Sequence, residues 1–193
     1  EFKGFFKNVL LRKYATLRRP IFIIEVGTWK GLSAITMASI AKECGVPISI
    51  ICVDTWLGAP EFWTWGLNDK TRGGSLKCKN GYPQVYYTFL NNVVCKGHED
   101  VIVPFPISSN EAFKVFEYHG VFADMIYVDA AHEYEAVKHD IENYWKLLQN
   151  GGMLFGDDYM ANWPGVMKAV DEFSSTKRKG SLVIDGVVWG VWK

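Results

Sequence analysis

The stretch IFIIEVGTWKG at residues 21–31 decides the fold class of this 193-residue chain. A run of mostly β-branched residues ends before Gly27, and residues 32–41 have the apolar spacing of a helix. Gly27 and Gly31 would let the backbone turn tightly between the two, so that a bound group can approach the helix N-terminus. The stretch therefore predicts a strand, a ligand-binding turn and a helix.

The spacing of these glycines argues against two phosphate-binding loops. A dinucleotide fingerprint, G-x-G-x-x-G from Gly27, would need glycine where the chain has Trp29. A phosphate loop, G-x-x-x-x-G-K-S/T, would need its second glycine where the chain has Leu32. A nicotinamide dehydrogenase is accordingly the least favoured function.

Strand-like and helix-like patterns alternate along the chain, which predicts an α/β fold with a parallel sheet covered on both faces. The expected strands are residues 21–26, 48–53, 101–105, 125–129 and 153–156. The expected helices are residues 1–20, 34–44, 84–94, 110–118, 134–148 and 165–173. Asp185-Gly186 separates two β-rich runs, residues 181–184 and 187–192, and predicts a closing antiparallel hairpin. We expect one domain over residues 1–193.

Ligands of open α/β sheets lie outside the carboxyl ends of the strands, and acidic residues gather at those ends here. Asp54 closes its strand where a carboxylate can accept both hydroxyls of a ribose; a turn or cap role is the alternative. Asp129, Asp157 and Asp158 follow two strands that should be neighbours, and three carboxylates suit a divalent cation. Mg²⁺ is the first expectation, with Mn²⁺ or Ca²⁺ as alternatives, and a metal-free turn pair at Asp157-Asp158 stays open.

Glu25-x-Gly27-x-x-x-Gly31 resembles the first motif of class I S-adenosylmethionine-dependent methyltransferases. The resemblance implies a Rossmann-like, seven-stranded, mostly parallel sheet with helices on both faces and an antiparallel C-terminal hairpin. It implies S-adenosyl-L-methionine as cofactor and places Ser108 and Ser109 beside the adenine, although Ser109 as a helix cap is an equal alternative. The expected cofactor-binding residues are Glu25, Gly27, Thr28, Trp29, Gly31, Ser33, Asp54, Ser108, Ser109 and Asp129.

The second half of the chain is similar to bacterial-type small-molecule O-methyltransferases. The motifs are D-x-x-H-x-Y from Asp129, G-G-x-x-x-x-D-D-Y from Gly151, and W-P-G-V at residues 163–166. The resemblance to metal-dependent O-methyltransferases implies Asp129, Asp157 and Asp158 as metal ligands. His132 stands where the catechol type has its general-base lysine, so His132 and Asp129 are the expected catalytic residues; a capping or packing role is the alternative for His132. The sugar type has its base where this chain has Ala131.

Residues 57–83 form a connection too long for an ordinary loop, and we expect a lid or acceptor-binding insertion. Its aromatic side chains could stack on a sugar or a planar acceptor, or could form a satellite core. Gly73-Gly74 and the charges between Lys70 and Lys79 favour an exposed, flexible lid. Deletion of residues 70–79 should therefore change acceptor affinity more than cofactor affinity.

Composition sets the remaining expectations. Lys and Arg together number 21, as do Asp and Glu, so no net charge draws the chain to nucleic acid or to an anionic membrane. Four cysteines without C-x-x-C spacing favour a reducing, cytoplasmic compartment, although the chain begins at Glu1 without Met and a native N-terminus could be missing. Trp189 and Trp192, expected to be exposed near the terminus, are candidates for core or homodimer contact.

The leading functional hypothesis is O-methylation of a hydroxylated small molecule, a sugar or a phenol or diol, assisted by a divalent metal. A metal-independent methyltransferase acting on another acceptor would keep Glu25, Gly27 and Asp54 but would ignore EDTA. A catalytically silent nucleoside-binding module would bind the cofactor without turnover.

Overall fold

The computed structural model describes residues 1–64, 76–177 and 181–193, and its described strands form one seven-stranded sheet. The strand order is β3-β2-β1-β4-β5-β7-β6, in which β7 runs antiparallel to both of its neighbours and the other pairs are parallel. The strands are β1 (Ile21–Val26), β2 (Ile48–Asp54), β3 (Ile102–Pro106), β4 (Ala123–Val128), β5 (Leu148–Gly156), β6 (Leu182–Asp185) and β7 (Val188–Trp192). The predicted Rossmann-like α/β architecture is confirmed.

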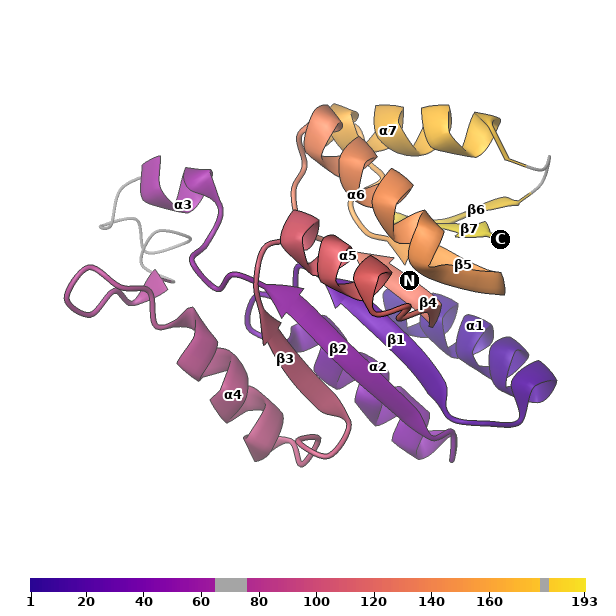
Figure 1. Cartoon of the computed structure of the whole chain (residues 1–193), viewed down its shortest axis with the longest axis horizontal. Helices are drawn as coiled ribbons and strands as arrows, with labels where there is room; N and C mark the ends of the chain where they lie inside the picture. Colours follow the sequence, from indigo (N-terminus) through magenta and orange to yellow (C-terminus); the bar gives the residue numbers. More distant parts are fainter. Residues whose placement is uncertain (65–75, 178–180) are drawn as a thin grey trace.

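Helices cover both faces of the sheet, as Figure 1 shows. One face carries α1 (Phe2–Leu17), α2 (Leu32–Glu43) and α4 (Val85–Cys95). The other carries α5 (Ser109–Tyr118), α6 (Tyr134–Leu147) and α7 (Pro164–Ser175). The short helix α3 (Pro60–Thr64) stands apart from both layers, beyond the end of β2 (Figure 1). Because the two helix layers shield the faces of the sheet, the ends of the strands are left to bind ligands.

The central strands β1 and β4 are mostly apolar, and both of their faces are buried. Every residue of β4 is buried, and β1 alternates its side chains between two cores, with Ile23 facing one and Ile24 the other. Helix α2 places small and flexible side chains, Ala34, Met37, Ala38 and Ala41, on its buried face, so that its backbone lies close to the sheet. Parallel pairing of β1 with β4 places the carboxyl ends of these two strands side by side.

Several boundaries differ from the sequence-based expectations. Strand β5 begins at Leu148, directly after α6, although the apolar pattern indicated a start at Met153. The hairpin forms as predicted, but its loop is Gly186-Val187, since Asp185 already pairs with Val188. Gly186 takes the left-handed backbone conformation (φ 63°) that the turn requires.

Trp189 is not exposed as expected. Its side chain is 1% exposed because β7 lies inside the sheet, between β5 and β6, where Trp189 pairs with Gly156. Trp192 is partly buried, and the Arg12 guanidinium lies 4.4 Å from the centre of its ring. Trp189 therefore belongs to the core.

Within the described part of the chain, no helix has the length and apolar character needed to cross a membrane. The four cysteines are all unpaired thiols in the structure.

Candidate functional site

The turn after β1 alternates left-handed and ordinary backbone conformations. Gly27, Trp29 and Gly31 have φ values of 82°, 51° and 85°. A Cβ on Gly27 would lie 2.2 Å from the backbone oxygen of Asp129, so that only glycine lets the turn pass the end of β4. Trp29 takes its strained conformation while its carbonyl accepts a hydrogen bond from Trp56 Nε1 at 2.8 Å. The predicted tight turn is present, and α2 begins directly after Gly31.

Glu25 lies beneath this turn and has no solvent exposure. Its carboxylate accepts hydrogen bonds from Thr28 Oγ1 at 2.7 Å, from Ser33 Oγ, and from Cys52 Sγ at 3.2 Å. Burial raises the pKa of Glu25, and the two hydroxyl donors act in the opposite direction. Glu25 does not line the cavity described below, so it positions the turn from within.

Asp54 joins the turn to the end of β2. Its Oδ2 accepts the backbone N–H groups of Thr28 (3.1 Å) and Trp29 (2.8 Å), and its Oδ1 accepts that of Trp56 at 2.7 Å. A carboxylate has about four acceptor positions, which leaves room for about one further donor. Asp54 also lines the cavity, so it can hold the turn and accept one hydroxyl of a bound nucleoside.

A cavity of about 940 Å³ extends along the carboxyl ends of the strands. It is bounded by the glycine turn, the end of β2, the start of α5, and the segments after β4 and β5. Phe2 and Lys3 at the start of α1, Tyr127 on β4 and Trp163 before α7 also line it; these four residues were not predicted. Trp163 belongs to the W-P-G-V motif, but that motif gave no role for its side chain, and Phe2, Lys3 and Tyr127 meet the site only through the tertiary fold. The predicted residues that line the cavity are Gly27, Thr28, Trp29, Ser33, Asp54, Ser108, Ser109, Asp129, His132, Asp157 and Asp158.

Ser108 and Ser109 have different roles at the start of α5. Ser108 is the N-cap, and its side chain accepts a hydrogen bond from the backbone N–H of Glu111 at 3.3 Å. Ser109, the residue considered as a cap from sequence, is the first residue of the helix itself. The cap is therefore one residue earlier than expected, and the Ser109 side chain is left beside the cavity.

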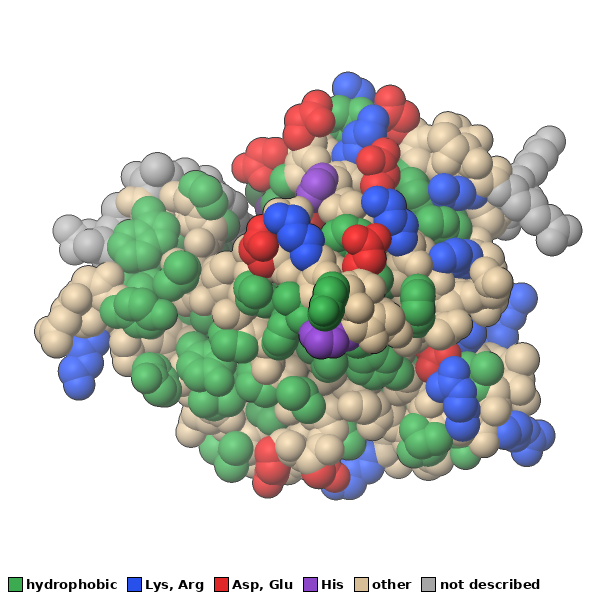
Figure 2. Space-filling model, viewed as in Figure 1, with side chains coloured by type: hydrophobic (Ala, Val, Ile, Leu, Met, Phe, Trp, Pro, Cys, Tyr) green, Lys and Arg blue, Asp and Glu red, His purple; other side chains and the backbone are tan. Residues whose placement is uncertain are grey.

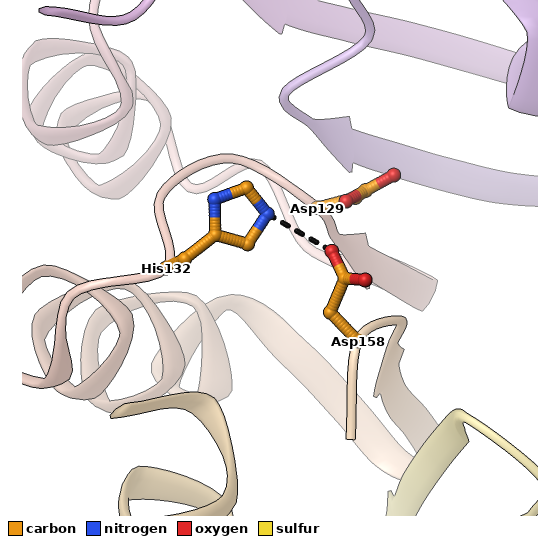
Figure 3. Close-up of side chains that lie close together, drawn as sticks. All are labelled: Asp129, His132 and Asp158. Atoms are coloured by element: carbon orange, nitrogen blue, oxygen red, sulfur yellow. Dashed lines mark hydrogen bonds and ion pairs between the residues drawn. The ribbon is translucent and has the colours of Figure 1, made fainter. Parts of the chain in front are cut away.

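Two carboxylates and one imidazole of the cavity lining meet beyond the ends of β4 and β5. Asp129 follows β4, His132 precedes α6, and Asp158 follows β5; their ligand atoms all lie within 4.8 Å of one another. Figure 3 shows the hydrogen bond between His132 Nε2 and Asp158 Oδ2, which is 2.9 Å long. The His132 ring stacks on Trp163 at 4.0 Å between centroids. The arrangement fixes an imidazole between an aromatic face and a carboxylate.

Burial and neighbouring negative charge disfavour ionisation of Asp129. Burial, followed by the charges of Asp158 and Asp157, raises the pKa of Asp129 to about 7. Tyr127 donates its hydroxyl to Asp129 Oδ2 at 3.2 Å, which partly offsets the increase. A cation, or a ligand with donor groups, would relieve this repulsion.

Asp157 does not join the three-residue cluster that the structure forms from described residues. Its Oδ1 accepts the backbone N–H of Asp158 at 2.9 Å, and Asp158 has a left-handed backbone (φ 63°). This turn directs the two adjacent side chains differently, so Asp158 meets His132 while Asp157 lines the cavity beside it. The sequence alone could not show whether Asp157 or Asp158 would face His132.

The described part of the 57–83 insertion brings the aromatic side chain of Phe62 to the cavity. Phe62 on α3 lies 4.7 Å from Trp29 between ring centroids, and both line the cavity. Figure 2 shows hydrophobic side chains gathered over α3 and α4, whereas charged side chains gather over α6 and α7. Trp65, Lys70 and Gly73-Gly74 lie outside the described residues. The insertion as a lid stays a prediction.

Comparison with known proteins gives a consistent picture. The model of a methyltransferase domain family matches residues 24–159, whereas no curated protein matches the chain. The O-methyltransferase NovP superimposes with a TM-score of 0.69 at 20% identity, covering 99% of this chain and 78% of that chain. The calicheamicin methyltransferase CalS11 gives 0.63 at 18% identity, with coverages of 96% and 76%. An O-methyltransferase from Bacillus cereus, solved in complex with S-adenosylhomocysteine (SAH), gives 0.64 at 12% identity, with coverages of 99% and 80%.

At identities of 12–20%, the solved structures show only that the fold is shared. The match to the family model is what assigns the chain to a family. That match spans well over half of the chain and contains the glycine turn, Asp54, Asp129 and both carboxylates after β5. The chain therefore belongs to the methyltransferase domain family and is a class I S-adenosylmethionine-dependent methyltransferase.

Proposed function

We propose that the protein transfers the methyl group of S-adenosylmethionine to a hydroxyl oxygen of a small molecule, with a divalent metal beside His132. The observation that carries the proposal is the cluster of Asp129, His132 and Asp158 at one end of a cavity whose other end has the features of a nucleoside site. NovP and CalS11, which share the fold, carry names of O-methyltransferases, and CalS11 is a TDP-rhamnose 3′-O-methyltransferase. A hydroxylated acceptor such as a sugar fits the same chemistry.

The cofactor is proposed to lie along the strand ends. Asp54 accepts a ribose hydroxyl, and the turn from Gly27 to Gly31 holds the amino-acid part near the N-terminus of α2. The sulfonium then lies toward Asp129, at the end of β4. This order follows from the sheet, in which β1 separates β2 from β4.

The reaction is an in-line displacement at the methyl carbon. The acceptor oxygen forms the new carbon–oxygen bond while the carbon–sulfur bond breaks. The electron pair of the carbon–sulfur bond stays on sulfur, so the sulfonium becomes a neutral thioether. His132 takes the hydroxyl proton, and Asp158, 2.9 Å away, stabilises the imidazolium that forms. Trp163 stacks on the ring and fixes its plane, so the base is held in position before the acceptor binds.

The residues present fit a hard divalent cation. Asp129 and Asp158 supply carboxylate oxygens within 4.8 Å of one another, and Asp157 is the third carboxylate of the proposed set. Burial first, and then the charges of Asp158 and Asp157, raise the pKa of Asp129, so a cation bound there would stabilise its ionised form. Mg²⁺ or Mn²⁺ bound there would lower the pKa of an acceptor hydroxyl and hold it in place.

Titration with Mn²⁺ alone, followed by electron paramagnetic resonance and calorimetry, tests the metal assignment without any acceptor. We expect one site in the wild type and at least about tenfold weaker binding in Asp129→Asn and Asp158→Asn. Asp171→Asn, a similar change on the exposed surface of α7, serves as the control. SAH affinity should stay within about threefold in all three variants. Unchanged Mn²⁺ binding in both site variants would reject the metal site.

A second candidate is a metal-independent methyltransferase, which the hydrogen bond between His132 and Asp158 favours. An Asp–His pair can remove a proton without a cation. Once an acceptor is found, turnover that persists in EDTA but is lost in His132→Gln would support this second mechanism. Turnover that requires Mg²⁺ or Mn²⁺ would support the first.

A further inference from the structure

The W-P-G-V motif at residues 163–166 opens α7 where that helix meets the segment of His132. Trp163 is the N-cap of α7, and Pro164 is its first residue, where the missing N–H of proline leaves no helical hydrogen bond unmade. The ring of Trp163 lies against the His132 imidazole. The motif therefore brings the first turn of α7 to the proposed base.

Gly165, the second residue of α7, is where this helix touches the backbone beside His132. A Cβ on Gly165 would lie 2.4 Å from the backbone oxygen of His132 and 2.7 Å from the backbone nitrogen of Tyr134. The backbone of Gly165 is not left-handed, so the close approach, and not conformational freedom, is what requires glycine here. Any larger residue would push α7 away from His132.

A polar contact joins the same two elements further along α7. Tyr134 begins α6, two residues after His132, and its hydroxyl donates a hydrogen bond to Glu172 on α7. Lys138 Nζ donates to the Tyr134 hydroxyl at 3.2 Å and to Glu172 Oε2 at 3.3 Å. The Lys168 ammonium, also on α7, lies 3.9 Å from the centre of the Tyr134 ring. The H-x-Y and W-P-G-V motifs of the sequence thus meet where α6 packs on α7.

The sheet itself does not hold His132, which lies between the end of β4 and the start of α6. Among the described residues, the last backbone hydrogen bond from this segment to the sheet is that of the Asp129 N–H to Val26, at 2.8 Å. The contact of His132 with Asp158 leads only to another connecting segment, the one after β5. The position of the imidazole therefore depends on α7.

We propose that α7 holds His132 in place, with Gly165 and Tyr134 as positioning residues for the proposed base. The inference rests on the proposed role of His132 in the methyl transfer. Gly165 sets how closely α7 approaches the His132 backbone, and the hydrogen bond of Tyr134 to Glu172 keeps the start of α6 on that helix. The base is then ordered before the acceptor arrives, so acceptor binding does not have to order it.

The rate at which diethylpyrocarbonate acylates each histidine, followed by mass spectrometry at one fixed pH, tests the proposal without cofactor, metal or acceptor. The chain supplies its own scale, because His119 is exposed, the His132 side chain is 23% exposed and His98 is 5% exposed. Gly165→Ala and Tyr134→Phe should each raise the His132 rate, relative to that of His119, at least about threefold. The His98 rate should not change, since the effect is local.

Two matched variants serve as controls. Gly4→Ala is also a change in the first turn of a helix, α1, but nothing lies within 4 Å of its Cβ position. Tyr87→Phe removes a hydroxyl from α4 that makes no hydrogen bond with a described residue, on a side chain that is 61% exposed. Both should leave the His132 rate unchanged. If Gly165→Ala also makes His98 reactive, the fold as a whole has opened, and Tyr134→Phe decides the test.

The outcomes separate this inference from the proposed function. An unchanged His132 rate in the folded variants would overturn the positioning role of α7 and leave the proposed reaction standing. With an acceptor in hand, a raised His132 rate should be accompanied by a fall in kcat of at least about tenfold, with SAH affinity unchanged. A raised His132 rate with unchanged kcat would overturn the role of His132 as the base, and with it the proposal that α7 positions a base.

Discussion

Gly27 is the residue at which one added carbon would disturb the site most directly. Its left-handed backbone costs a substituted alanine about 1 kcal/mol, and the new Cβ would overlap the backbone oxygen of Asp129. We expect Gly27→Ala to lower the free energy of unfolding by well over 1 kcal/mol and to abolish detectable SAH binding. Urea denaturation and calorimetry measure the two effects.

Gly45 provides the matched control for Gly27. It is also left-handed (φ 65°), but nothing lies within 4 Å of the Cβ position. Gly45→Ala should therefore cost only the backbone energy, about 1 kcal/mol, and leave SAH affinity unchanged. Equal effects of the two substitutions on SAH binding would show that the close approach of the turn to β4 does not matter for the site.

Individual residues also show what sequence reasoning could not resolve. The glycine turn was predictable because backbone conformation depends on local residue type. The inward direction of Glu25, the cap at Ser108 and the facing of Asp158 toward His132 depend on backbone geometry that spans one or two residues. A shift of one residue moves a side chain to another surface, so the sequence could not give these orientations: Glu25 was expected to bind the cofactor, and the cap was considered at Ser109.

Asp124 joins three elements at the amino ends of β1 and β4. Its carboxylate accepts two hydrogen bonds from the Arg19 guanidinium, at 2.7 and 2.8 Å, and one from the backbone N–H of Phe22 at 3.0 Å. We expect Asp124→Ala to lower the free energy of unfolding by about 2–3 kcal/mol, because the partly buried N–H of Phe22 and the Arg19 guanidinium lose their acceptor. SAH affinity should not change, since the cofactor cavity lies at the opposite end of the strands.

Two other variants calibrate the Asp124 measurement. Arg19 is about half exposed (49%), so Arg19→Ala should cost less than Asp124→Ala, about 1 kcal/mol. Glu111→Ala breaks an exposed ion pair with Lys114, and its effect on the free energy of unfolding should be the smallest of the three. A cost for Asp124→Ala no larger than that for Glu111→Ala would contradict the joining role.

At the scale of elements, periodicity predicted most helices and strands, and it was wrong where tertiary contacts decide. Residues 148–150 extend β5 although they lack a strong strand pattern. The Asp185-Gly186 pair predicted the hairpin, but pairing of Asp185 with Val188 moved its loop by one residue. Trp189 is buried because its strand is inserted between two others, an arrangement that no local pattern shows.

At the scale of the whole molecule, the strand order determines which groups of the candidate site are neighbours. Because β1 and β4 are adjacent at the centre of the sheet, the turn at Gly27 and the backbone of Asp129 lie side by side although about a hundred residues separate them in sequence. The alternation of strands and helices predicted an open α/β sheet, and ligands of such sheets lie at this edge, so the edge could be predicted as the site. The contribution of α1 to the cavity, through Phe2 and Lys3, depends on how the first helix packs on the finished sheet, and the sequence gives no local sign of it.

Calorimetric titration of the protein with SAH, in Mg²⁺ and in EDTA, tests the central claim that the cavity along the strand ends is a cofactor site. We expect one site per chain with a dissociation constant on the order of micromolar, which corresponds to about −8 kcal/mol. Asp54→Ala should weaken binding strongly, because it removes both the proposed ribose acceptor and the anchor of the glycine turn. Absence of binding by the folded wild type in both conditions would contradict the assignment of the cavity.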